Sequence, residues 1–90
     1  MQYAFLSEVT TDRHSPLPLY LQIANGISGL IKKGVLQSGQ KLPGSRLMAE
    51  KLGVHRSTLM LALDELQAEG WLTSREKRGW YVSEKLPLQQ

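Results

Sequence analysis

The stretch LGVHRSTLMLALDELQAEGWL, from Leu52 to Leu72, decides the fold. It opens with a glycine turn signal and a basic, hydroxyl-rich cluster, and it continues as an amphipathic segment whose second half carries only acidic charges. Apolar residues at i, i+3, i+4 and i+7 indicate one face of an α-helix. These core positions are Leu59, Ala62, Leu63 and Leu66. The pattern predicts a helix from Arg56 to about Glu69, ended by Gly70.

Two upstream segments predict two more helices. After the breaker SPLPL at 15–19, an apolar stripe predicts a helix for which Gly34 is a good stop. The stripe consists of Tyr20, Ile23, Ile27, Leu30 and Ile31. Farther along, Ser45 is predicted to be the N-cap of a helix of about eight residues that ends at Gly53. Its predicted inward positions are Met48, Ala49 and Leu52.

The C-terminal part predicts a β-hairpin. Two short β-like segments, WLTSR and WYVS, are separated by the polar sequence EKRG. The order helix, helix, glycine-containing turn, helix and hairpin predicts a winged helix-turn-helix, a mainly α fold of three helices plus a wing. We assign this domain to residues 16–83. Residues 1–15 are predicted to be a loosely ordered leader, and residues 84–90 a tail or the start of a linker.

Composition restricts the class of protein. Ninety residues make one small domain, and the absence of cysteine excludes disulfides and cysteine-based zinc sites. The chain has neither a signal-peptide pattern nor the roughly 18 consecutive apolar residues of a membrane span. It also lacks a glycine-rich phosphate loop and the common hydrolase motifs. We therefore expect a soluble, cytoplasmic, non-enzymatic protein without a membrane partner and, because its two histidines lack ligand spacing, without a metal.

Charge is segregated along the chain, although the net charge is only +3. Positive residues gather at 56–58 and 75–78, whereas residues 60–70 hold Asp64, Glu65 and Glu69 and no base. Segregation of this kind is typical of a surface that binds nucleic acid.

The first turn of the predicted third helix carries the strongest functional signal. In a helix-turn-helix, the N-terminal residues of the second helix of the motif face the bases in the major groove. Arg56 can bind guanine O6 and N7 together or a phosphate, and Ser57 and Thr58 can bind either. Arg46 is predicted to contact a phosphate, because the preceding helix crosses the DNA backbone. The alternative is ordinary capping, with both arginines solvated.

Of three neighbouring side chains, two allow more than one interpretation. His55 either contacts a phosphate from an N-cap position or is a plain turn residue. Met60 projects near Arg56, off the core stripe, and either touches a thymine methyl or is simply exposed. Leu61 is predicted to pack against a neighbouring element.

The hairpin supplies the predicted wing. Lys77, Arg78 and Gly79 suit a tip that lies against the DNA backbone or enters the minor groove, with the glycine allowing close approach. A solvated hairpin tip is the alternative. Trp71 is predicted to be a core residue. Trp80 is predicted to pack under the wing, with contact to DNA sugars as the alternative.

Several spaced motifs resemble one known family. Across about residues 16–83, the sequences PLYLQI, GQKLPGSRLMAEKLGV, HRSTL, ALDELQAEGWL and GWYV resemble the N-terminal DNA-binding domain of GntR-family transcription regulators. The resemblance implies a dimer on a short pseudo-palindromic, double-stranded DNA operator. It also implies that Arg46 reaches DNA, that residues 55–58 form the recognition cluster, and that Gly79 approaches the minor groove. His55 replaces a more usual Ser or Thr, and EKRGW is bulkier than the family's GSGT-like wing.

The resemblance extends to two branches of the family. LPGSR, HRST and ALDELQAEGW look most similar to the MocR-type branch, whose C-terminal part resembles a fold-type I aminotransferase that binds pyridoxal phosphate. The YtrA-type branch, with a small helical dimerisation tail, is the alternative. Either branch implies a C-terminal domain beyond these residues and a homodimer, and the ninety residues themselves are expected to bind no cofactor. The rival function is a protein–protein contact through Leu47, Met60 and Leu61.

Overall fold

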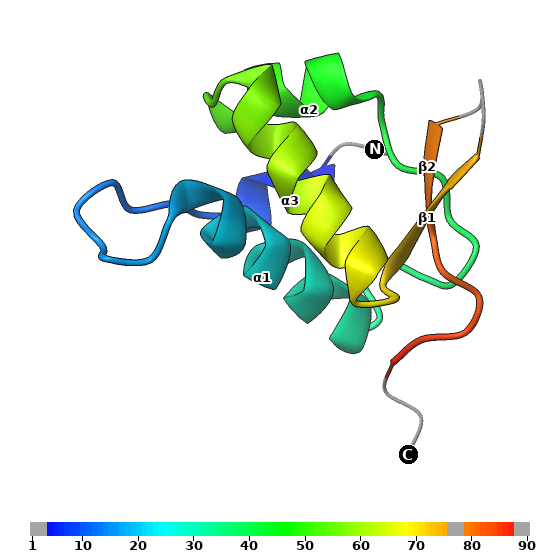
Figure 1. Ribbon diagram of the computed structural model, residues 1–90. Helices are drawn as coiled ribbons and strands as arrows, with labels where there is room; N and C mark the ends of the chain where they lie inside the picture. Colours follow the sequence, from blue (N-terminus) through cyan, green and yellow to red (C-terminus); the bar gives the residue numbers. More distant parts are fainter. Residues whose placement is uncertain (1–3, 76–78, 88–90) are drawn as a thin grey trace.

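The computed structural model describes residues 4–75 and 79–87 of the chain. Three α-helices and a two-stranded antiparallel hairpin make a winged helix-turn-helix, which confirms the predicted fold (Figure 1). The helices are α1 (Leu19–Lys32), α2 (Ser45–Leu52) and α3 (Arg56–Ala68). The strands are β1 (Leu72–Arg75) and β2 (Gly79–Val82), and a short 3-10 helix, η1 (Ala4–Glu8), precedes them all.

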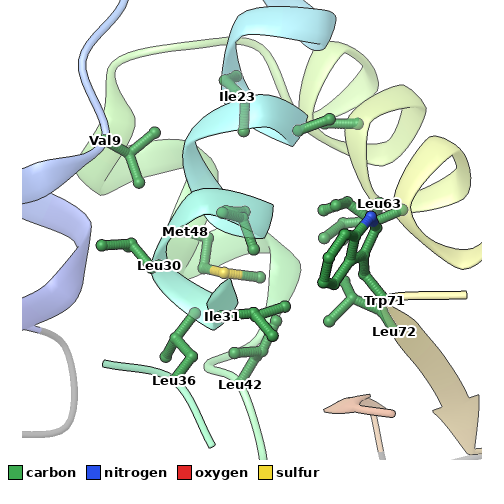
Figure 2. Close-up of a cluster of buried hydrophobic side chains, with 14 of the residues drawn as sticks. Val9, Ile23, Leu30, Ile31, Leu36, Leu42, Met48, Leu63, Trp71 and Leu72 are labelled. Carbon is green, nitrogen blue, oxygen red and sulfur yellow. The ribbon is translucent and has the colours of Figure 1, made fainter. Parts of the chain in front are cut away.

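The core forms where α3 crosses α1 and packs beside α2 (Figure 1). All four predicted core residues of α3 have no exposed surface, so the predicted inner face is confirmed. Each fully buried leucine of this kind contributes about 2 kcal/mol through the hydrophobic effect. Figure 2 shows side chains from all three α-helices, from the connector between α1 and α2 (residues 33–44) and from the start of the hairpin in one core; among them are Ile31, Leu36, Leu42, Met48, Leu63 and Leu72.

The start of α2 differs from the prediction. Gly44, in an extended conformation, is the N-cap, and Ser45 is the first helical residue. Because glycine has no side chain, Gly44 cannot cap α2 with a side-chain hydrogen bond. The Ser45 hydroxyl instead accepts a hydrogen bond from Arg56, at the start of α3. The predicted end of α2 is confirmed, because Gly53 adopts the left-handed conformation with φ 70°.

The hairpin is tied to the helical body by the connector that precedes α2. Its strands pair in antiparallel register, from Leu72 opposite Val82 to Arg75 opposite Gly79. Lys41 forms an antiparallel β-bridge with Tyr81, so the connector runs beside β2. These nonlocal contacts fix the base of the wing.

The N-terminal segment packs on the helices at residues 5, 6 and 9, where a loosely ordered leader was expected. Phe5, Leu6 and Val9 are all buried in the core, beside α1 and α2. Val9 packs where α1 carries Gly26, and its Cγ1 lies 3.1 Å from the position that a Cβ would take there. The missing side chain of Gly26 therefore lets the N-terminal segment dock closely. None of the helices in the described residues is long and apolar enough to cross a membrane.

Candidate nucleic-acid interface

The first turn of α3 forms an exposed polar surface. His55 occupies the N-cap position with extended backbone, Arg56 and Ser57 are exposed, and Thr58 is half-buried. No acidic residue occurs in this turn. The His55 side chain makes no capping hydrogen bond within the described residues. The first backbone N–H groups of a helix are left unpaired, and its dipole is positive there, so this end attracts anions.

A side-chain hydrogen bond joins the starts of α2 and α3. Arg56 donates from Nε to the hydroxyl Oγ of Ser45 over 3.2 Å. This bond leaves the two terminal amino groups of the guanidinium for an external acceptor. Arg46 follows Ser45 in the same turn of α2, and its side chain is exposed. The structure thus joins the start of α3 to the start of α2 through Ser45, to which the sequence assigned a different role.

The outer face of α3 differs from the predicted one at two residues. Ser57, Leu61 and Asp64 lie opposite the core stripe, since successive residues of a helix turn by about 100°. Leu61 is 54% exposed, so the expectation that it packs against a neighbouring element is wrong. Met60 is half-buried and packs against the core, so it is not simply exposed. Any apolar contact to a base from this face therefore falls to Leu61.

The second half of α3 is acidic. A side-chain hydrogen bond with Glu69, some loss of solvation and the negative charge of Glu69 together raise the pKa of Glu65. Asp64 is exposed nearby. The negative charge of these carboxylates disfavours a polyanion at this end of the helix.

The wing carries two cations, Lys41 and Arg75, that the sequence interpretation did not assign to the DNA surface. The predicted tip residues Lys77 and Arg78 lie outside the described residues. Gly79 begins β2 with φ 101°, a conformation that favours glycine. A Cβ built on it would lie 3.8 Å from Cε of Lys41. Arg75 stacks its guanidinium over the ring of Tyr81, 4.5 Å from the centroid.

These two cations differ in how far the sequence predicts their positions. Arg75 precedes EKRG, and strand alternation alone would have put it on the outer face of the hairpin. Lys41 has no such local signal, because only the pairing of the connector with β2 brings it to the wing. The two tryptophans behave as predicted: Trp71 is buried, and Trp80 is half-buried against the core.

Comparison with known proteins identifies the family. Residues 19–82 match the family described as bacterial regulatory proteins, gntR family. The chain belongs to this family. Among curated relatives, it is 40% identical over 72 residues to the HTH-type transcriptional repressor NagR of Bacillus subtilis, covering 80% of this chain and 30% of that protein. It is 39% identical over 72 residues to the probable rhizopine catabolism regulatory protein MocR of Rhizobium meliloti, covering 80% of this chain and 15% of that protein.

Solved structures agree with this assignment to the GntR family. The YtrA transcription factor from Sulfolobus acidocaldarius superposes with a TM-score of 0.83 and 38% identity, covering 88% of this chain and 83% of that one. The DNA-binding domain of AraR, solved in complex with operator ORX1, superposes with a TM-score of 0.74 and 31% identity, covering 81% of this chain and 90% of that one. Because relatives named MocR and YtrA both occur, the branch stays undecided.

Proposed function

We propose that this GntR-family domain binds double-stranded DNA in a sequence-specific manner, as the DNA-binding part of a transcription regulator. The observation that carries the proposal is the Arg56–Ser45 hydrogen bond, which joins the starts of α2 and α3 into one exposed basic surface. The superposition on the DNA-binding domain of AraR, a protein solved with its operator, supports the same function.

The proposed roles follow from position. Arg56 and Ser57 lie at the start of α3 and contact base edges in the major groove, with Thr58 at their side. Arg46 anchors a phosphate from α2. Gly79 allows the wing to approach the DNA closely, and Lys77 and Arg78 remain proposed phosphate contacts of the wing. His55 contacts a phosphate from the N-cap position.

Further properties of the whole regulator are part of the same proposal. The chain spans 30% of NagR and 15% of MocR, so a C-terminal domain would supply dimerisation and any effector or pyridoxal phosphate site. The regulator would be a cytoplasmic protein without catalytic activity in this domain. It would be a homodimer, because a palindromic operator matches a two-fold protein.

The rival function, a protein–protein contact, lacks its predicted surface. It needs an apolar patch made of Leu47, Met60 and Leu61. Met60 packs against the core and Leu47 is half-buried, which leaves Leu61 as the strongly exposed member.

A salt titration tests DNA binding. The chain is titrated into a fluorescent mixed-sequence duplex at rising salt, and anisotropy gives the affinity. We expect the logarithm of the association constant to fall linearly with the logarithm of salt, since bound phosphates release counterions. Binding that is absent at low salt, or that does not depend on salt, would contradict the proposal.

A further inference from the structure

A cation from the N-terminal segment reaches the turn of the helix-turn-helix. Arg13 donates a hydrogen bond from Nη2 to the carbonyl oxygen of Gly53 over 3.3 Å, in the turn between α2 and α3. Its side chain lines a pocket together with residues at the starts of α1 and α3. The other residues that line this pocket are Leu19, Gly53, Val54, His55 and Thr58. Two of these, His55 and Thr58, belong to the proposed DNA surface.

The backbone around Arg13 is fixed in place by α1. Gln22 of α1 accepts a hydrogen bond from the backbone N–H of Asp12 over 2.7 Å and donates one to the Asp12 carbonyl over 3.0 Å. Val9 is buried a few residues earlier. The carboxylate of Asp12 accepts a hydrogen bond from the backbone N–H of His14 over 2.9 Å. Arg13 is therefore presented from an ordered segment, which lowers the entropy cost of using it in binding.

The remaining hydrogen-bond donors of Arg13 favour a ligand with several acceptor oxygens. The bond to Gly53 uses one of five N–H groups of the guanidinium. The side chain is exposed, and its pocket neighbours include no carboxylate. A guanidinium suits the bidentate geometry of a phosphate. Because Arg13 lies beside the turn rather than on the outer face of α3, it would meet the DNA backbone and not the base edges.

We propose that Arg13 is a DNA-binding residue that contacts a backbone phosphate beside the first turn of α3. This inference rests on the proposed function. It makes the N-terminal segment part of the DNA interface as well as part of the core.

The test compares charge-removing variants at two sites. Arg13→Gln and the matched control Lys33→Gln each remove one exposed positive charge, but Lys33 follows the far end of α1. Each chain is titrated into the same mixed-sequence duplex over a salt series. We expect Arg13→Gln to weaken binding by about 3- to 10-fold at low salt and to make the log–log salt slope shallower by about 0.9, the effect of one lost phosphate contact. We expect Lys33→Gln to change neither value and Arg13→Lys to keep the slope.

The outcomes separate the two proposals. A wild-type slope in folded Arg13→Gln would overturn the role of Arg13 and leave DNA binding intact, whereas a wild-type chain that fails to bind would overturn both. A measurement on the wild-type chain tests the role of Arg13 even if the Arg13→Gln variant does not fold. In a nitrogen-15 NMR titration with the same duplex, the side-chain Nε–H resonance of Arg13 should shift, and an unmoved resonance would overturn the role.

Discussion

The direction of the Arg56 side chain depends on a hydroxyl in another helix. The acceptor, Ser45, lies eleven residues earlier in the chain, and the Gly44 N-cap leaves its hydroxyl free for Arg56. A base contact from arginine requires a fixed guanidinium plane, because the two hydrogen bonds to guanine are coplanar. We therefore expect Ser45 to position the guanidinium of Arg56.

Replacing Ser45 by alanine should separate positioning from helix stability. In Ser45→Ala we expect the free energy of unfolding to change by less than about 0.5 kcal/mol, since the hydroxyl caps no helix. We expect DNA affinity to fall several-fold and base preference to weaken at the position that Arg56 contacts. Thermal unfolding and duplex titrations measure the two effects. A loss of stability near 1 kcal/mol, the usual cost of removing an N-cap, with unchanged affinity would restore the capping role.

Met60 and Leu61 are adjacent residues with opposite expected roles. Met60→Ala should lower the free energy of unfolding by about 1–2 kcal/mol, because its side chain packs against the core. Leu61→Ala should leave stability nearly unchanged, because Leu61 is 54% exposed, and should alter DNA preference at one thymine-containing position. Chemical denaturation and selection from random duplexes measure these effects. The opposite pattern would show that α3 is rotated relative to this description.

For single residues, the residue types of the proposed DNA surface were predictable from the sequence. The hydrogen-bond partners of those residues were not. The basic, hydroxyl-rich first turn of α3 follows from the local sequence at 55–58. The contacts of Arg56 with Ser45 and of Arg13 with Gly53 join residues that are distant in the chain. Such pairs are set by tertiary packing, which periodicity does not encode.

Among the elements, α1 offers two glycine positions at which the close packing of the N-terminal segment against this helix can be tested. Its two interior glycines form a matched pair. A Cβ on Gly29 would meet nothing within 4 Å, whereas one on Gly26 would lie 3.1 Å from Cγ1 of Val9. We expect Gly29→Ala to stabilise the protein by about 0.5–1 kcal/mol through helix propensity.

Gly26→Ala should stabilise less than Gly29→Ala or should destabilise, because the added methyl group crowds Val9. In a Val9→Ala background the penalty of Gly26→Ala should shrink. A double-mutant cycle by chemical denaturation measures this coupling. Equal gains at both glycines, with no coupling to Val9, would mean that the segment does not pack against α1 as described.

The helices were the most predictable elements, and the leader was the least. Each α-helix shows an apolar repeat, and glycines at 53 and 70 mark two of the ends. The leader has three buried apolar residues, Phe5, Leu6 and Val9, in a short 3-10 helix and a loop. Three residues in irregular structure produce no periodic signal, so only the assembled core shows that they are buried.

For the molecule as a whole, the N-terminal segment contributes Phe5, Leu6 and Val9 to the core. We expect Phe5→Ala to lower the free energy of unfolding by about 3 kcal/mol, as for other buried aromatic residues. Thermal unfolding followed by circular dichroism measures the loss. The exposed neighbour Ser7 gives a control, since Ser7→Ala should have little effect. Equal, small effects of the two variants would place the segment outside the folded core.

Positive and negative charges occupy different elements of the described chain. The first turns of α2 and α3, Arg13 and the wing cations Lys41 and Arg75 are basic, whereas the second half of α3 is acidic. The family assignment and this asymmetry lead to the same account, in which the start of α3 contacts the bases and the surrounding cations hold the backbone.

Selection from a random duplex library tests this central claim most directly. Wild-type chain and Arg56→Ala are each used to enrich bound duplexes at low salt, and the enriched sequences are compared. We expect the wild type to enrich a half-site and Arg56→Ala to lose preference at one base position or more, with salt-dependent binding retained. Folded wild-type protein that enriches no sequence, or an Arg56→Ala variant that enriches the same half-site equally well, would contradict the account.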